Sequence, residues 1–324
     1  MKKSFKLFLA AAFLVTEFFV VALPLMITSA KADGHPIQAI THAGFGGGTD
    51  VTTSMMLLRT RRYLKQDMQL VNKKGGGGAA SMDYMMTLPA DGQHTLTWTT
   101  GHAVSMALGK TKVKLSDMQP LARGTDDPQL FVVNCKNEIK DAKKFISAQK
   151  SKSLKYGTTH VGGIDDVSAI AFTKKGKLTD PTIVPYKGVG PIKTNLIKGD
   201  IDVGVLNLGE ADTEIEDGTL CVSVVLASNR MEKLSNVPTA TELGIPVVLS
   251  TVRGFVTRKG VPADRKKQLE DAMIKAMEHK YFQSFLTDIG LDSTSVVGAD
   301  EWGKQMEVML AEMTAQLKAL GYIN

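Results

Sequence analysis

A glycine-rich turn near the start of the chain has the composition of an anion-binding site. Four glycines fall within the five positions 44–48, inside the run HAGFGGGTD (42–50). A strand-like run, 37–43, precedes this turn, and a helix-like run, 50–64, follows it. Glycines let a backbone approach a ligand closely, and the first N–H groups of a helix have no partners within the helix. We therefore predict that the turn binds a negatively charged group, although a plain strand-to-helix turn would need only one or two glycines.

Three further glycine clusters follow strand-like runs. Their sequences are NKKGGGG (72–78), YGTTHVGG (156–163) and VPYKGVG (184–190). A single glycine turn is ordinary, but open α/β sheets bind their ligands beyond the carboxyl ends of their strands. The repetition of the arrangement therefore favours a binding site built from several strand ends.

The motifs that an enzyme would need are incomplete or absent. The sequence has no G-x-S-x-G and no H-E-x-x-H, and the P-loop-like GKT at 109–111 lacks its leading glycine because position 104 is Val. A dinucleotide fingerprint begins at Gly44 but has Thr49 in place of its third glycine. We therefore expect a binding protein without catalysis, cofactor or metal.

Acidic and histidine side chains near the glycine clusters allow sharper interpretations. Asp165 and Asp166 begin a helix-like run, where they either cap the helix, which we favour, or meet an amine on the ligand. An exported enzyme with Asp50 or Asp166 as general base is the weakest alternative, because no paired nucleophile is visible. Three histidines on segments that we place at the site indicate ligand hydrogen bonding or a pH-sensitive contact rather than a metal: His42, His102 and His160.

Short apolar runs alternate with amphipathic runs, which predicts an α/β fold for the elements that position these residues. The expected strands are 37–41, 68–71, 95–99, 129–133, 154–156, 182–185, 201–205, 221–227 and 247–256. The expected helices are 50–64, 79–87, 142–149, 166–174, 191–197, 264–279 and 300–320.

Helical spacing places particular side chains together on one face of two of these helices. In the first helix, Val51, Met55, Leu58 and Arg62 fall on one face. The last helix carries an apolar stripe that we interpret as core rather than as a cofactor site: Trp302, Met306, Met309, Met313, Leu317 and Leu320.

The N-terminus has the features of an export signal. Three lysines precede a mostly apolar run, 7–27, and Ala30-Lys31-Ala32 matches an A-x-A cleavage site. Cleavage near Ala32-Asp33 would leave the mature chain in the periplasm, although the long run leaves an uncleaved anchor open. An oxidising compartment would permit a disulfide between Cys135 and Cys221, but the sequence does not say whether they come close enough.

The charge of the chain fits a small anionic ligand better than a nucleic acid. The whole chain carries +6, and positions 1–32 hold four Lys and one Glu, so the remainder carries about +3. This mild excess, with interspersed charges and few aromatic residues, does not resemble a nucleic-acid surface. It would weakly favour anionic small molecules.

Seven short motifs, taken together and in order, resemble one protein family. They are GFGGGTD, VNKKGGGGAAS, PADGQHTL, LKYGTTHVGG, VPYKGVGP, KGDIDVGV and SNVPTATELGIP. The chain resembles the substrate-binding receptors of tripartite tricarboxylate transporters, the Bug family, across essentially its whole mature length. The resemblance implies a two-lobed α/β periplasmic binding protein of type II-like architecture, in which each lobe is a mixed sheet flanked by helices and a hinged central cleft lies between the lobes.

The resemblance also implies how the chain is divided. Residues 1–32 would form the signal peptide, 33–130 with 255–324 the first lobe, and 131–254 the second lobe. The chain would cross between the lobes near 127–133 and 252–256.

Family members hold a ligand carboxylate through backbone amides and ordered waters from both lobes. Two helix N-termini that meet across a cleft would bind an anion in this way without a buried cation. Matching and neighbouring positions give the predicted ligand-binding set: Phe45, Gly47, Gly48, Thr49, Asp50, Thr100, His102, Thr158, Thr159, His160, Gly162, Gly163, Asp166 and Tyr186. Phe45, His160 and Asp166 depart from the family pattern, which leaves the identity of the ligand open.

The function that the resemblance implies is capture of a small organic acid and its delivery to a membrane permease made of a large and a small subunit. Candidate ligands are citrate-like tricarboxylates, C4 dicarboxylates, aromatic acids, acidic amino acids and nicotinate-like acids. We expect a monomer. A sensory or scavenging receptor that signals to a membrane partner is the alternative, which the neighbouring genes would distinguish.

Overall fold

The computed structural model describes residues 35–159, 162–319 and 321–323. The expected signal peptide at 1–32, with its cleavage site at Ala32-Asp33, lies outside the described residues, as does His160. Residues Gly34–Asn324 group together as one compact unit. Within the described residues, no helix has both the length and the apolar character that a membrane crossing requires.

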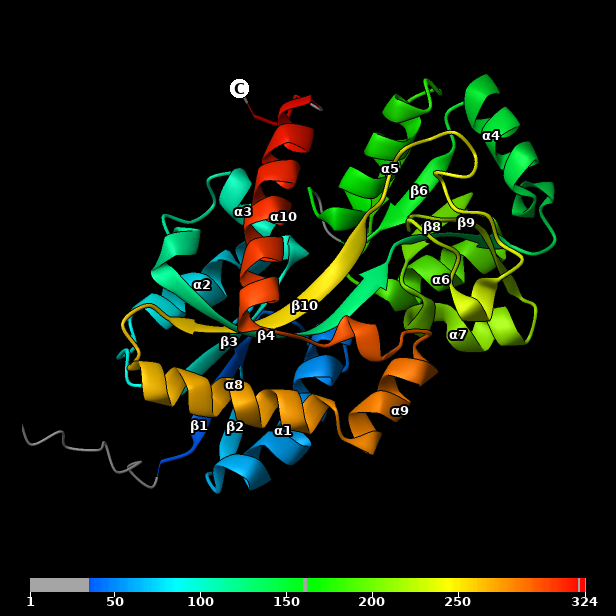
Figure 1. The fold of residues 1–324 in the computed structure, drawn as a ribbon. Helices are drawn as coiled ribbons and strands as arrows, with labels where there is room; N and C mark the ends of the chain where they lie inside the picture. Colours follow the sequence, from blue (N-terminus) through cyan, green and yellow to red (C-terminus); the bar gives the residue numbers. More distant parts are fainter. Residues whose placement is uncertain (1–34, 160–161, 320, 324) are drawn as a thin grey trace, which may run out of the picture. The chain divides into compact units, whose positions relative to one another are not determined.

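Two mixed β-sheets organise the described chain (Figure 1), as the sequence predicts. The first has the strand order β11-β4-β10-β3-β1-β2. Its strands are β1 (Ile37–Thr41), β2 (Met68–Asn72), β3 (His94–Thr99), β4 (Met118–Pro128), β10 (Ser250–Arg258) and β11 (Val297–Gly298). The second sheet has the order β7-β6-β8-β5-β9. Its strands are β5 (Leu130–Asn134), β6 (Lys155–Thr158), β7 (Thr182–Pro185), β8 (Val203–Leu206) and β9 (Leu220–Val225).

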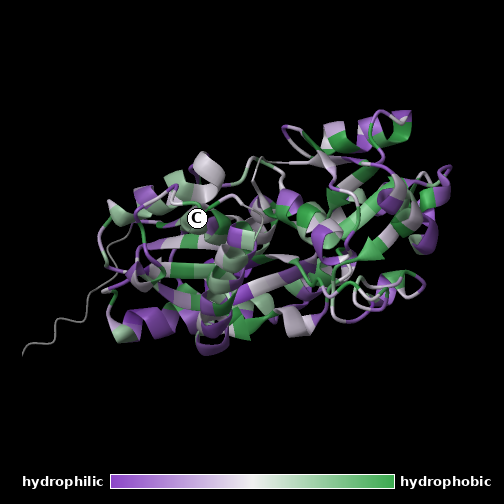
Figure 2. Ribbon diagram, turned by 90° about the horizontal axis from the view of Figure 1, so that it is seen from above, coloured by the Kyte–Doolittle hydropathy of each residue, from purple (hydrophilic) through white to green (hydrophobic). Residues whose placement is uncertain are grey.

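Helices cover both faces of each sheet, and central strands such as β3 and β8 are accordingly buried along almost their whole length. Against the first sheet, α1 (Gly48–Leu64), α8 (Ala263–Met277) and α9 (Lys280–Asp288) pack in one core cluster, whereas α2 (Ala79–Met86), α3 (Thr100–Ala107) and α10 (Ala299–Ala319) pack in another. The second sheet is covered by α4 (Ala142–Ser151) and α5 (Ile164–Lys175) on one face, and by α6 (Val189–Lys198) and α7 (Leu208–Glu216) on the other. Figure 2 shows the apolar strands inside and polar residues along the outer helices.

The two sheets are joined where β4 leads into β5 and where the chain returns to β10. Only Gln129 separates β4 from β5. Its N–H donates to the carbonyl of Leu249 at 2.9 Å, and its carbonyl accepts from the N–H of Leu226 at 2.9 Å. The connections are therefore two adjacent, hydrogen-bonded stretches of chain rather than loose linkers.

Among the strands and α-helices that the structure describes, five are not among the sequence predictions: β4, α3, α7, α9 and the short β11. The sequence of β4, MQPLARGTDDP, has two prolines, one glycine and three charged residues and lacks the apolar alternation of a strand. It becomes a strand because β10 pairs with it antiparallel along its whole length. Such long-range pairing leaves no local pattern to read.

The first helix forms close to the predicted bounds, and Val51 and Leu58 do not lie on its buried face. Val51 and Leu58 are 37% and 44% exposed, and the buried face is rich in threonine instead. The hydroxyls of Thr52, Thr53 and Thr60 donate to the carbonyl four residues earlier in the helix. Because these polar groups are satisfied within the helix, they can be buried against the sheet.

The stripe on the last helix is confirmed as core. Trp302, Met306, Met309, Met313 and Leu317 are all buried, whereas Leu320 lies outside the described residues. A Cβ added to Gly254 in β10 would lie 2.3 Å from the Trp302 indole, so this strand needs a glycine to let the ring pack.

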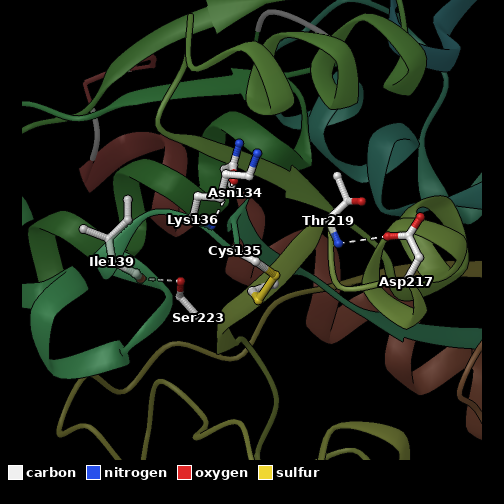
Figure 3. Close-up of a disulfide and its surroundings, with 8 residues drawn as sticks. Asn134, Cys135, Lys136, Ile139, Asp217, Thr219 and Ser223 are labelled. Atoms are coloured by element: carbon white, nitrogen blue, oxygen red, sulfur yellow. Dashed lines mark hydrogen bonds between the residues drawn. A yellow bond between two sulfur atoms is a disulfide. The ribbon is translucent and has the colours of Figure 1, made fainter.

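The two cysteines form a disulfide, which resolves the question that the sequence leaves open. Cys135 follows β5 and Cys221 lies in β9, with their Cα atoms 5.0 Å apart (Figure 3). The strands are already paired here, since Val133 lies opposite Cys221 and the N–H of Cys135 donates to the carbonyl of Thr219. The disulfide thus fixes two neighbouring strands that are distant in sequence.

Candidate ligand-binding site

The glycine-rich turn places the N-terminus of α1 directly beyond the end of β1. Gly47 is the N-cap, and no side chain caps the helix there. Asp50 instead stabilises the turn: its carboxylate accepts from the N–H of Gly46 at 3.0 Å and from Nδ2 of Asn72 at 3.1 Å. Asp50 is thus engaged with the turn itself, which leaves the first-turn amides as the group of α1 suited to an anion.

Phe45 stands out from this turn. Its side chain is 81% exposed, and Nζ of Lys74 lies 5.5 Å from the ring centroid. Lys74 also lies beside Gly44, where an added Cβ would be 3.4 Å from Nζ. An exposed aromatic ring and a lysine therefore flank the glycine turn.

A second glycine-capped helix N-terminus follows β6. Gly163 is the N-cap of α5, again without a side-chain cap. The carboxylate of Asp165 accepts from the N–H of Thr159 at 2.8 Å and from its hydroxyl at 2.6 Å. The carboxylate of Asp166 accepts from the N–H of Gly162 at 2.6 Å. In these bonds both aspartates hold the loop before α5 instead of capping the helix, so they do not confirm the favoured capping interpretation.

Thr158 and Tyr186 lie together at the carboxyl ends of β6 and β7. The N–H of Tyr186 donates to the carbonyl of Thr158 at 2.8 Å. Thr158 is fully buried, and its hydroxyl has no hydrogen-bond partner among the described residues. A buried hydroxyl of this kind is a group that a ligand or water could satisfy.

His102 and Thr100 have bonds that favour a structural role for both. His102 is fully buried; its Nδ1 accepts from the N–H of Thr99 at 3.0 Å, and its Nε2 lies 3.0 Å from the hydroxyl of Ser81. Because Ser81 already donates to the carbonyl of Gly78, Nε2 carries the proton of a neutral ring. Burial and the neighbouring charge of His42 lower the pKa of His102 well below its usual value, which also keeps the ring neutral.

Thr100, the first residue of α3, is bonded to β10 through its hydroxyl. That group donates to the carbonyl of Ser250 at 2.9 Å and accepts from the N–H of Val252 at 2.9 Å. These bonds hold the start of α3 against the returning strand.

Arg253 of β10 is a charged residue that the sequence analysis missed, and its position contradicts the expectation of no buried cation. Its side chain is only 4% exposed. Nε lies 3.3 Å from the hydroxyl of Thr49 in α1, and Nη1 donates to the carboxylate of Asp127 at 3.1 Å. A lone arginine inside an otherwise apolar strand-like run is the signal that could have identified it, because a buried charge needs a partner.

A buried carboxyl group, that of Asp127, and a partly buried one, that of Glu210, lie in the electrostatic field of Arg253. Burial raises the pKa of Asp127 to about 6, and the charge and hydrogen bonds of Arg253 offset part of that rise. Burial also raises the pKa of Glu210, in α7, to about 7. There the negative charge of Asp165 adds to the rise, and the positive charge of Arg253 opposes it. Charged groups from β4, α5, α7 and β10 therefore influence one another electrostatically.

A cavity of about 720 Å³ is lined by Arg123, Asp126 and Ser250 of the first sheet and by residues that follow β9, such as Arg230. Arg123 is fully engaged here, because its three nitrogens donate to carbonyls of Thr294 and Ser295 and to the side chains of Asp126 and Gln305. Of the predicted site residues that the structure describes, Thr100 alone lines this cavity. The described residues also contain no group of three His, Cys, Asp or Glu side chains arranged to hold a metal ion.

Two mixed sheets flanked by helices, with helix N-termini at the strand ends, match the fold of solved periplasmic binding proteins. The sequence profile of the tripartite tricarboxylate transporter family receptor matches residues 55–320. The chain therefore belongs to this family, whose members are solute-binding receptors rather than enzymes.

Individual relatives are distant. The protein BugT of Bordetella pertussis is 27% identical over 220 residues, which are 65% of this chain and 66% of BugT. MatC from Rhodopseudomonas palustris, solved with bound malate, is 22% identical, covers 87% of this chain and 98% of its own, and has a TM-score of 0.76. Rpa4515 from R. palustris, solved with adipate, is 21% identical, covers 88% of this chain and 97% of its own, and has a TM-score of 0.78. At such low sequence identities, the structural similarity shows a common fold and nothing more.

Proposed function

We propose that this protein is a periplasmic receptor that binds one small organic carboxylate between its two sheets and delivers it to a tripartite tricarboxylate permease. One observation carries the proposal: α1 and α5 each follow a parallel strand and begin at a glycine N-cap that no side chain caps. Helix N-termini of this kind bind anions through their first-turn amides and through the helix dipole.

The structural relatives support the carboxylate class. MatC holds malate and Rpa4515 holds adipate, and both have the fold of this chain. Two dicarboxylates of different length on one fold suggest that the shared feature is the carboxylate and that the remainder of the ligand is read elsewhere. We expect Phe45 and Asp166, which depart from the family pattern, to make the ligand preference of this chain differ from that of MatC and Rpa4515.

The division into lobes and the ligand-binding set are part of the same proposal. The first sheet takes its strands from 37–128 and 250–298, and the second from 130–225. This membership supports lobes of 33–130 with 255–324 and of 131–254. Among the predicted ligand residues, the described geometry supports Gly47, Gly48, Thr49, Gly162 and Gly163 most directly.

A thermal-shift screen tests the proposal. The purified protein is first unfolded and refolded to remove co-purified ligand, and is then heated with malate, adipate, citrate, glutamate, nicotinate and the methyl ester of each. A ligand at a hundred times its Kd adds about 2.7 kcal/mol to the free energy of unfolding. For a chain of this size, that raises Tm by about 5 °C.

A shift with at least one acid that disappears on esterification is the expected result. Deletion of the gene should then abolish uptake of that acid into cells. If none of the acids shifts Tm, the carboxylate proposal fails and only the fold is established.

A further inference from the structure

The guanidinium of Arg253 lies beneath the N-terminus of α1, at the point where the first sheet meets the connecting stretches. In the register of the sheet, Arg253 lies opposite Thr99 of β3 and Thr125 of β4. Its side chain is only 4% exposed. Because arginine is not deprotonated in proteins, this is a permanent positive charge that has been taken out of water.

The described residues satisfy only part of this group. Nη1 donates to the carboxylate of Asp127 at 3.1 Å and lies 3.4 Å from the hydroxyl of Thr125. Nε donates to the hydroxyl of Thr49 at 3.3 Å. Among the described residues, Nη2 has no hydrogen-bond acceptor, so one corner of the guanidinium is left to bind something else.

That corner faces the first residue of α1. A Cβ added to Gly48 would lie 2.7 Å from Nη2, so the nitrogen approaches the helix backbone where only a glycine leaves room. Two positive groups then meet, because the helix N-terminus carries a partial positive charge and Nη2 carries part of a full one. An anion placed between them would be attracted by both.

The two nearby carboxylates already have hydrogen-bond partners. Asp50 accepts from Gly46 and Asn72 in the turn, and Asp127 accepts from Nη1 of the guanidinium. A carboxylate with two oxygens can accept from a guanidinium N–H and from backbone amides together. The geometry therefore fits a carboxylate from outside the chain.

We infer that Arg253 is a ligand-binding residue, whose Nη2 and the first-turn amides of α1 together hold one carboxylate of the bound organic acid. This inference rests on the proposed function and adds a specific cation to it. The ligand then needs at least one ionised carboxylate on the α1 side, and Asp127 is a positioning residue that orients the guanidinium.

The test removes the ion pair without leaving a buried charge behind. In the double variant Arg253→Gln/Asp127→Asn, two neutral hydrogen-bonding side chains replace the pair. The matched control is Arg123→Gln/Asp126→Asn, which removes another arginine–aspartate pair of the same 3.1 Å separation that lines the cavity instead. Calorimetric titration measures the Kd of malate, adipate, citrate and glutamate for all three proteins, and thermal unfolding shows that each is folded.

We expect the Arg253 double variant to lose at least tenfold in affinity for the acid that the wild type binds. We also expect it to lose most of the wild-type preference for that acid over its methyl ester. The control should keep both. A folded Arg253 double variant with wild-type affinity and preference would overturn the inference while leaving the receptor function standing. A wild type that binds none of the acids would overturn the proposed function, and the inference with it.

A second variant covers the case in which the double variant does not fold. Gly48→Ala puts a methyl group against Nη2 at a helical position that tolerates alanine, and should weaken carboxylate binding at least tenfold. Gly190→Ala, at the start of α6 with open space around it, is its control and should leave Kd unchanged. Unchanged affinity in Gly48→Ala would contradict the inference as well.

Discussion

At the scale of single residues, the site region combines one buried arginine with two carboxyl groups whose pKa values are raised. Burial raises the pKa of Asp127 to about 6 and that of Glu210 to about 7. Asp127 has Arg253 as a direct partner, whereas Glu210 accepts from the N–H of Asn207 in a capping box. Glu210 therefore contributes a negative charge only above neutral pH, close to where a ligand carboxylate would be held.

Glu210 should make the stability of the protein fall as the pH rises from about 4.5 to about 7. In the unfolded chain its pKa is near 4.5, so between the two values the folded state holds a proton that the unfolded state has lost. Its contribution is fully present below the unfolded pKa and disappears above the folded one. Because the side chain is partly exposed to solvent, we expect a loss of about 1–2 kcal/mol rather than the full shift. Thermal unfolding of the wild type and of Glu210→Gln at pH 5, 6, 7 and 8 measures this loss.

The Glu210→Gln variant cannot ionise and should show a shallower decline of Tm over this window. Glu216→Gln, an exposed residue of the same helix, is the control and should follow the wild type. His102, whose pKa is lowered, destabilises the wild type and the variant alike on acidification, so the difference between the two proteins reports on Glu210. Identical slopes for the wild type and Glu210→Gln would show that Glu210 is already ionised at neutral pH.

At the scale of elements, α1 is held to the first sheet by hydroxyl groups as well as by apolar contacts. The hydroxyl of Thr53 lies 2.8 Å from that of Thr97 in β3, and both residues are buried. Thr53 also bonds to the carbonyl of Thr49 in the first turn. The threonine-rich face thus connects the strand next to β10 with the turn that we expect to bind the ligand.

Thr53→Val should destabilise the protein by about 1–2 kcal/mol, because it leaves the buried hydroxyl of Thr97 without its partner at unchanged side-chain shape. The double variant Thr53→Val/Thr97→Val removes both hydroxyls and should cost less than the sum of the two single changes. Urea unfolding gives the three free energies. Val51→Thr, on the exposed outer face of α1, should stay within about 0.5 kcal/mol of the wild type. Additive single and double changes would mean that the hydroxyl pair contributes nothing.

Elements with a local pattern could be predicted from the sequence, and elements that depend on distant partners could not. Strands such as β1 and β7 have an apolar run bounded by turns and are confirmed at both ends. By contrast, β4 has no such pattern and exists because β10 pairs with it. The buried face of α1 could not be predicted from hydropathy, which does not register a threonine that bonds back to its own helix.

The same contrast explains what could be predicted of the candidate site. Glycine turns such as those at Gly47 and Gly163 are visible in the sequence because the backbone needs that residue type. Arg253 is 204 residues away from Thr49 in the chain, and no local rule brings the two together. Contacts between charged residues that are distant in the sequence depend on the order of strands in the sheets. The sequence alone predicts the strands but not that order.

At the scale of the whole molecule, the Cys135–Cys221 disulfide closes a segment with a sequence separation of 86 residues. That segment contains β6, β7 and β8, the three strands that complete the second sheet with β5 and β9. The disulfide therefore restricts the unfolded chain over most of that sheet.

Replacing both cysteines by alanine should lower the free energy of unfolding by about 4–5 kcal/mol, the loop-entropy value for a segment of this length. Guanidinium unfolding of the oxidised protein, the reduced protein and the double variant measures the effect, and reduction should reproduce most of it. The variant should still bind the same acid, because the disulfide lies at the β5–β9 edge, away from the glycine turns. Equal stability of the oxidised and reduced proteins would show that the disulfide is redundant with the strand pairing.

The position of β10 in the first sheet affects how the protein is made. β10 lies between β4 and β3, so before it is present β1, β2 and β3 have no strand that joins them to β4. The second sheet, in contrast, is complete by residue 225. During synthesis or passage through a membrane pore, the second sheet can therefore form before the first. Until residues 250–258 emerge, the edge of β3 stays uncovered. That interval is where we would expect a chaperone or a protease to act on this protein.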